Sequence, residues 1–133
     1  MGAMTNYLES GLLGHLFKKQ TFPSPDVLLC GLITDASNEA SLEGGTATLA
    51  MDKLAVSGGI SWSDPFESGS AYAVKNIVDI TFPVATGNKG YVSGVGLYIG
   101  SSMIFYGSLT NAREIRDKDQ FVFPSGSLKI TFN

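Results

Sequence analysis

Few residues of this chain could carry out chemistry. It holds one histidine, His15, and one cysteine, Cys30. A zinc site of nitrogen and sulfur ligands needs several such groups, so only symmetric copies could form one, with three His15 rings meeting on a threefold axis. A single cysteine also excludes a disulfide within the chain. Its place in the apolar run "VLLCGLI" predicts a buried and inert thiol.

Nucleophilic and acid–base catalysis also lack a complete set of groups. No serine stands in a Gly-x-Ser-x-Gly motif, and His15 alone would have to serve as the base. Asp117 and Asp119 lie in "REIRDKDQ", where interleaved cations predict a solvated loop rather than the fixed carboxylate pair of a glycosidase. "GVGLYIG" contains Gly-x-Gly, but no helix follows to hold a phosphate. We therefore expect no enzyme, no metal and no other cofactor.

The composition describes one domain with a low density of surface charge. Its 133 residues are 44% hydrophobic and only 16% charged, with a net charge of −3. The basic residues are scattered, so we expect no nucleic-acid partner. No run approaches the ~18 apolar residues of a membrane span, so we expect no membrane partner. Residues 1–4, "MGAM", resemble an expression-vector remnant, which leaves residues 5–133 as a single domain.

One helix is predicted, over residues 6–19. Its apolar residues fall on one stripe: Leu8, Leu12, Leu13, Leu16 and Phe17. Asn6 and Glu9 have the spacing of a capping box. Gly11 and Gly14 each weaken the helix by about 1 kcal/mol relative to alanine. The helix is therefore expected to form because it docks on its own sheet or on a neighbouring subunit.

The rest of the chain predicts short strands separated by turns. Pro23 and Pro25 are expected to end the helix, and polar loops are expected over 35–46 and 113–120. Strands are expected over 26–34, 47–56, 60–64, 71–82 (as one strand or two), 91–99 and 103–109, with two more within 121–132. The strands over 91–99 and 103–109 are expected to pair as a hairpin. This spacing favours an all-β fold, an antiparallel β-sandwich of jelly-roll-like form with a short N-terminal helix. "ITFPVATGNKGYVSGVGLYIG", residues 80–100, is predicted to be a hairpin, and "ITFP" and "FVFP" to be two strands leaving the core at similar edges.

Glycines and aromatics provide the remaining functional signal. Gly94 and Gly96 fall on one face of a strand and predict a bare groove that another backbone or ring can approach. Tyrosines on neighbouring strands are suited to protein interfaces or sugar stacking. The candidate interface residues are Leu12, Leu16, Phe17, Tyr91, Gly94, Gly96, Tyr98 and Tyr106. The alternative, a glycan-stacking site, would use Trp62 and Tyr72.

Three stretches together resemble a family of small virion proteins of tailed bacteriophages, commonly labelled tail-fibre proteins. They are "TNYLESGLLGHLFKKQTFPSPDVLLCGLIT", "ITFPVATGNKGYVSGVGLYIG", and finally "MIFYGSLT" with "DQFVFPSGSLKITF". These stretches cover roughly two-thirds of the chain. The sequence departs from the family in its middle, where "GGTATLAMDKLAV" replaces a "GGYARQAV"-like segment.

The resemblance implies a structural role in the virion, on the tail fibre or as capsid decoration or cement. It supplies no catalytic residues. With the residues above, it leads us to expect a homo-oligomer, with a trimer favoured, that contacts other virion proteins. The alternative is a host-recognition adhesin that binds surface glycans.

Overall fold

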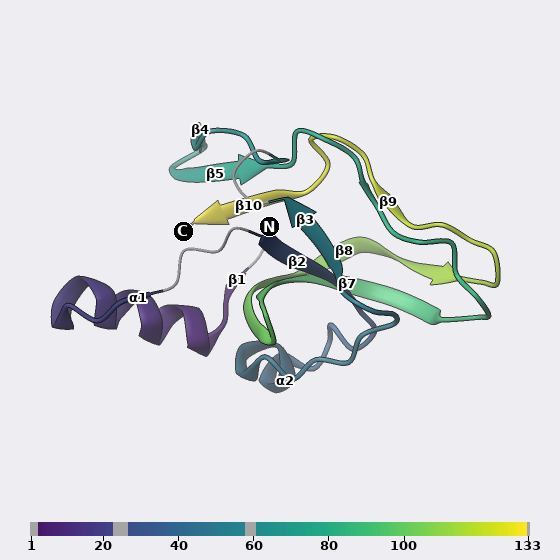
Figure 1. Cartoon of the computed structure of the whole chain (residues 1–133), viewed down its shortest axis with the longest axis horizontal. Helices are drawn as coiled ribbons and strands as arrows, with labels where there is room; N and C mark the ends of the chain where they lie inside the picture. Colours follow the sequence, from purple (N-terminus) through teal and green to yellow (C-terminus); the bar gives the residue numbers. More distant parts are fainter. Residues whose placement is uncertain (1–2, 23–26, 58–60, 133) are drawn as a thin grey trace.

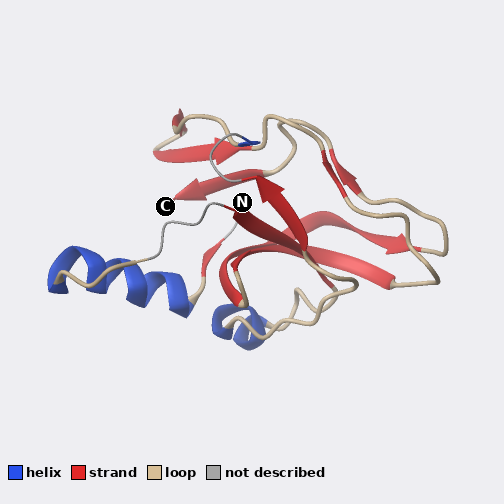
Figure 2. Cartoon of the chain, viewed as in Figure 1, coloured by secondary structure: helices blue, strands red, loops and turns tan. Residues whose placement is uncertain are grey.

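The computed structural model describes residues 3–22, 27–57 and 61–132 (Figure 1). It is built mainly of strands, with two helices (Figure 2). The elements in chain order are β1 (Ala3–Met4), α1 (Asn6–Lys18), β2 (Val27–Ile33), α2 (Glu39–Gly44), β3 (Leu54–Ser57), β4 (Phe66–Ser68), β5 (Ala71–Lys75), β6 (Ile80–Thr81), β7 (Gly90–Ile99), β8 (Ser102–Ile115), β9 (Val122–Phe123) and β10 (Lys129–Phe132). Residues 3–4, part of the segment predicted to be a vector remnant, pair with β8 as strand β1.

The strands form three antiparallel sheets. The largest has the order β1-β8-β7-β2-β3, a second has the order β10-β5-β4, and β6 pairs with β9 alone. The two smaller sheets lie together over one side of the large sheet (Figure 1). The predicted all-β antiparallel sandwich with an N-terminal helix is confirmed.

The large sheet buries side chains on both of its faces because successive residues point to opposite sides. Leu32, Leu97 and Ile104 pack in the main core with residues of the smaller sheets, among them Phe123 and Ile130. Their chain neighbours on the other face form a second cluster with a residue of α2: Ile33, Tyr98, Met103 and Leu42. The sheet is therefore covered by the small sheets on one face and by α2 on the other.

The predicted hairpin over residues 80–100 is wrong. β6 pairs with β9, in the register Ile80 with Phe123 and Thr81 with Val122, while β7 lies between β2 and β8. The two similar tetrads "ITFP" and "FVFP" are therefore partners of each other. The N–H of Phe82 also donates to the carbonyl oxygen of Phe121, at 2.9 Å. Local sequence could not reveal this pairing, because it joins segments about forty positions apart.

The predicted hairpin after residue 99 is confirmed and is longer than expected. β7 and β8 pair from Ile99 with Ser102 to Gly90 with Ile115, with two irregularities in register. The segment 113–120, predicted to be wholly loop, is therefore strand as far as Ile115.

Helix α1 begins one residue earlier than the capping-box pattern indicated. Thr5 is its N-cap: Oγ1 accepts from the N–H of Leu8 at 3.4 Å and donates to the carbonyl oxygen of Met103 at 2.6 Å. Thr5 is fully buried, so this hydroxyl also fixes the start of the helix on β8. The helix ends at Lys18, and its C-cap, Lys19, takes a left-handed conformation with φ of 57°. Pro23 and Pro25 lie outside the described residues.

The middle of the chain differs most from the prediction. Residues 35–46 contain α2, which the Asn38 side chain caps by accepting from the N–H of Ser41 at 3.2 Å. Within 47–56 only Leu54 onward forms a strand, and Leu49 makes a single bridge to Ile33. In the predicted strand 60–64, Trp62 makes one isolated bridge, to Asn76, and residue 60 lies outside the described part.

Candidate interaction site

The predicted interface residues fall into three separate places. Helix α1 carries Leu12, Leu16 and Phe17, and it projects away from the sheets at one end of the molecule (Figure 1). Strand β7 begins at the opposite end, with Tyr91 as its second residue. The remaining four residues lie on β7 and β8, between Gly94 and Tyr106. They do not form one continuous surface within a single copy.

The end of α1 is the most exposed apolar surface of the described chain. Leu16 is 71% exposed and Phe17 is 75% exposed, while Leu12 is half-buried against the main core. Leu13 is exposed too, at 58%, and it belongs with Leu16 and Phe17 because they are three and four residues further along the helix. We call Leu13, Leu16 and Phe17 the helix patch. Leu13 was on the predicted stripe but was not selected as a site residue.

The bare groove expected at Gly94 and Gly96 is absent, because the chain itself fills it. A Cβ atom on Gly94 would lie 2.7 Å from both Ala36 Cβ and the carbonyl oxygen of Gly107. A Cβ atom on Gly96 would lie 3.1 Å from Met103 Cε and 3.3 Å from Ile33 Cδ1. The two glycines therefore permit close packing inside the molecule.

The tyrosines near these glycines are covered to different extents. Tyr98 is only 4% exposed, and burial raises the pKa of its phenol to about 12, with Cys30 and Asp35 adding to the shift. Lys53 lies over its ring, 4.6 Å from the centroid. Tyr106 is half-buried against the second cluster, and burial is again the first cause of its raised pKa. Tyr91, at 61% exposed, is the accessible one.

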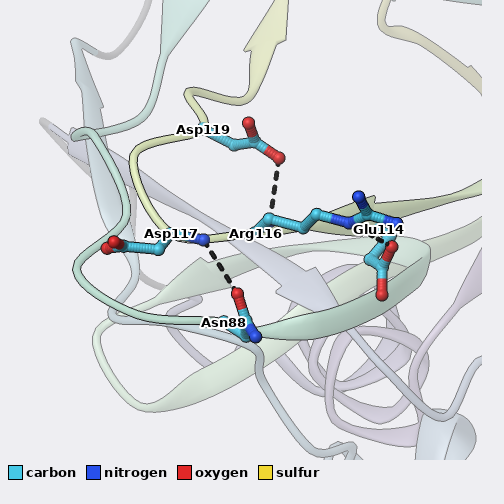
Figure 3. A network of polar contacts seen from close by, with 5 residues as sticks. All are labelled: Asn88, Glu114, Arg116, Asp117 and Asp119. Atoms are coloured by element: carbon cyan, nitrogen blue, oxygen red, sulfur yellow. Dashed lines mark hydrogen bonds and ion pairs between the residues drawn. The ribbon is translucent and has the colours of Figure 1, made fainter.

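The loop beside Tyr91 contains the acidic residues considered as catalytic candidates. Asp117 Oδ1 accepts from the N–H of Gly87 at 2.7 Å, and the N–H of Asp117 donates to Asn88 Oδ1 at 3.0 Å (Figure 3). Asp119 Oδ2 accepts from the N–H of Arg116 at 2.8 Å. Both carboxylates thus tie the loop after β8 to itself or to the loop before β7.

A surface ion pair joins the end of β8 to the start of the same loop. Arg116 Nε donates to Glu114 Oε1 at 2.7 Å, and this hydrogen bond is the first cause of a raised Arg116 pKa. The guanidinium is fully exposed, so solvent screens the pair and it contributes little to stability. Among the described residues, no group of three or more His, Cys, Asp or Glu side chains is arranged to hold a metal ion.

The predicted glycan residues meet at an apolar cleft of about 380 Å³ between the large sheet and the β10-β5-β4 sheet. Its lining includes Leu28, Trp62, Tyr72, Val74, Phe105 and Ile130. Tyr72 is 57% exposed, whereas Trp62 is partly buried and its Nε1 has no hydrogen-bond partner among the described residues. We call this feature the apolar cleft. The structure thus brings together two residues that the sequence suggested only by their type.

The two lone reactive side chains are placed without catalytic partners among the described residues. His15 is exposed on α1, and its Nδ1–H donates to the carbonyl oxygen of Gln20 at 3.0 Å. Cys30 is fully buried, as predicted, and burial raises the pKa of its thiol to about 12. None of the described helices is both long and apolar enough to cross a membrane.

A comparison with known protein families identifies the chain. The family model described as podophage GP4 fiber I protein gp80 matches residues 3–131. The chain belongs to this family. As a gp80 family member it is a phage fibre structural protein and a component of the virion, as the sequence resemblance implied. None of the curated proteins compared with the chain matches it.

Proposed function

We propose that this gp80 family member is a non-enzymatic fibre component that works by burying apolar surface against other copies of itself and against neighbouring virion proteins. The observation that carries the proposal is the helix patch. Three large apolar side chains, 58 to 75% exposed, share one side of a helix whose own buried residues are only Leu8 and Gly14. Contiguous exposed apolar residues of this kind mark interaction sites.

A homo-oligomer, with a trimer favoured, accounts best for this surface. A cyclic assembly buries the helix patch of every copy, so no copy is left with the patch exposed to water. A stable contact needs roughly 1,000 Å² of buried surface, more than three side chains supply, so Tyr91 and the edges of the sheets are proposed to contribute as well.

The non-enzymatic role is supported by what the polar side chains already do. The carboxylates of Asp117 and Asp119 accept backbone N–H groups, and His15 is bonded to a backbone carbonyl. These groups serve loop and helix geometry.

Two locations on the virion are distinguished by labelling phage particles with gold-conjugated antibody against this protein and imaging them by electron microscopy. A fibre role predicts gold along the fibres and no retention of the purified protein by empty heads. Capsid decoration or cement predicts gold on the head and retention by assembled shells. Particles without label in either place would contradict the proposal.

Glycan binding is the second candidate, favoured only by the meeting of Trp62 and Tyr72 at the apolar cleft. The lining is almost entirely apolar, whereas sugar hydroxyls need polar partners when they lose water. A glycan array tests this role directly. Binding that disappears in Tyr72→Ala would support it, and an array without hits would remove it.

A further inference from the structure

We propose that the helix patch of one copy inserts into the apolar cleft of the next copy, so that the subunits join head to tail. The proposal rests on the self-association proposed above and names the two surfaces that meet. The patch is Leu13, Leu16 and Phe17 on α1, and the cleft lies between β2, β7 and β8 on one side and β5 and β10 on the other.

The two surfaces match in chemistry and size. The cleft, at about 380 Å³, is too large to be an ordinary packing defect of a protein interior, and its lining is almost entirely apolar. Phe17 and Leu16 are the most exposed large apolar residues of the described chain. An aromatic anchor that enters such a cleft loses water from both surfaces, which is how binding hot spots form.

The helix cannot reach the cleft of its own copy. Its first turn is fixed, because Thr5 and Leu8 are buried and Thr5 Oγ1 is bonded to Met103. Further along, Gly11 packs on the ring of Phe22, which also contacts the ring of Tyr7 in a tilted arrangement, with centroids 5.7 Å apart. The far end of α1 therefore points away from the sheets, toward a neighbour (Figure 1).

Charge around the two surfaces is also complementary. Lys18 and Lys19 follow the helix patch, and neither makes an ion pair among the described residues. Beside the cleft, Asp64 precedes the lining residue Pro65, and Glu67 accepts from the hydroxyl of Tyr72 at 3.3 Å.

Both carboxylates beside the cleft are likewise without an ion pair among the residues described. The two lysines of that sheet are engaged locally. Lys75 lies 5.5 Å from the Phe66 ring centroid, and Lys129 donates to Ser68 Oγ at 3.0 Å. In the proposed contact, Lys18 and Lys19 of α1 therefore approach the carboxylates of Asp64 and Glu67 beside the cleft.

Such a contact joins two different surfaces, so it must close into a ring or grow into a filament. A three-membered ring is the closed form that agrees with the favoured trimer. Each subunit then gives one helix and receives one.

Disulfide trapping between two variants, each with one added cysteine, tests the contact. Chains with Leu13→Cys, which keep Leu16 and Phe17, carry a size tag and are mixed with untagged chains with Tyr72→Cys under mild oxidation, so that non-reducing gels separate mixed dimers from like pairs. The native Cys30 is fully buried and does not compete. Leu13 and Tyr72 are 58% and 57% exposed, so both variants are expected to fold. The matched control pairs Leu13→Cys with Val84→Cys, a site that is 53% exposed and does not line the cleft.

The expected result is at least about tenfold more mixed dimer for the pair 13 and 72 than for the pair 13 and 84. Equal yields would overturn the contact. If light scattering also shows an oligomer, the proposed self-association survives and only the helix-in-cleft contact fails. If light scattering shows a monomer, both fail.

Trp62 gives a second measurement, because it is the only tryptophan and it lines the cleft. Acrylamide quenching of its fluorescence is expected to rise at least about twofold in Phe17→Ser, since the inserted ring no longer shields it. The exchange Lys18→Glu should weaken association, and Glu67→Lys in the same chain should restore it. Unchanged quenching in Phe17→Ser would contradict insertion.

Discussion

Asn76 is the polar residue that joins the most segments of the core. It is fully buried, and its Nδ2 donates to the carbonyl oxygens of Val78, Phe123 and Pro124 while its Oδ1 accepts from the N–H of Leu128. These partners lie in β9 or next to β6, β9 and β10, so one side chain holds both small sheets in position. A buried polar group of this kind costs little when it is fully bonded and much when it is not.

Replacing Asn76 with aspartate should therefore lower the free energy of unfolding by about 3 kcal/mol or more, because a carboxylate would face three carbonyl oxygens. Urea unfolding, followed by Trp62 fluorescence, measures the change. The matched control is Asn88→Asp, an exposed site whose Oδ1 acceptor survives the exchange. It should cost less than about 1 kcal/mol. Equal losses in the two variants would show that Asn76 does not join the sheets.

Cys30 and Tyr98 make the stability of the fold sensitive to alkali. Burial raises the pKa of Cys30 from 9.0 to about 12 and that of Tyr98 from 10.0 to about 12. The folded state holds these protons more tightly than the unfolded chain does. Their contribution is therefore fully present below pH 9 and is lost as the pH rises toward 12.

The free energy of unfolding should accordingly fall between about pH 9 and pH 11, and it should fall less steeply in Tyr98→Phe and Cys30→Ala. Denaturant unfolding at several pH values gives the slope. Tyr91→Phe is the control, because that ring is exposed and its loss should leave the slope unchanged. A slope that is the same in all four proteins would contradict a role for the two buried groups.

At the scale of elements, the glycines of β7 determine how closely the large sheet packs. Gly94 faces Ala36 and the backbone of Gly107, both of which an added methyl group would meet at 2.7 Å. Backbone cannot move aside as a flexible side chain can. The two-residue spacing of Gly94 and Gly96 is thus a packing device within the subunit.

Gly94→Ala is expected to destabilise the protein by about 1–3 kcal/mol. Gly44→Ala is its matched control: Gly44 lies in the last turn of α2, and a Cβ atom there would have no neighbour within 4 Å. That exchange should be neutral or stabilising by up to about 1 kcal/mol, because alanine favours helix. Thermal unfolding of both variants decides the point. If Gly94→Ala is as stable as the wild type, the close packing at Gly94 is contradicted and the open groove predicted from the sequence is supported.

The elements differ in how far sequence could predict them. β2, β7 and the first half of β8 carry long alternating or continuous apolar runs, and helix α1 carries a clear stripe, so local pattern was sufficient there. The second half of β8 was missed because its residues are mostly polar and exposed. α2 was missed because this six-residue helix has a single buried side chain, Leu42. One apolar residue cannot show the hydrophobic periodicity from which a helix is predicted. The pairing of β6 with β9 was missed because register between distant strands is set by tertiary packing, here around Asn76 and the Phe82–Phe121 contact.

The candidate site was predictable only where exposure follows from local position. Leu16 and Phe17 lie beyond the docked first turn of α1, and the helical stripe identified them. The burial of Gly96 and Tyr98 depends on Met103 and on α2, whose placement no local pattern contained. The apolar cleft joins β2 to β5 and β10, so its lining could not be assembled from any one segment.

At the scale of the whole molecule, the gp80 family member combines a well-packed sandwich with an incompletely covered outer surface. The core clusters account for the large sheet and for the start of α1, while the end of α1 and Tyr91, the second residue of β7, are exposed. Exposed apolar side chains on separate elements of a subunit suit repeated contacts along a virion structure.

The mass of the purified protein in solution tests this account most directly. Multi-angle light scattering should give a multiple of the 14.1 kDa chain, with the trimer as the expected species. The mass should fall toward that of one chain in Leu16→Ser/Phe17→Ser, while its circular dichroism spectrum stays that of the wild type. A wild-type mass of 14.1 kDa at every concentration measured would contradict self-association through exposed apolar surface.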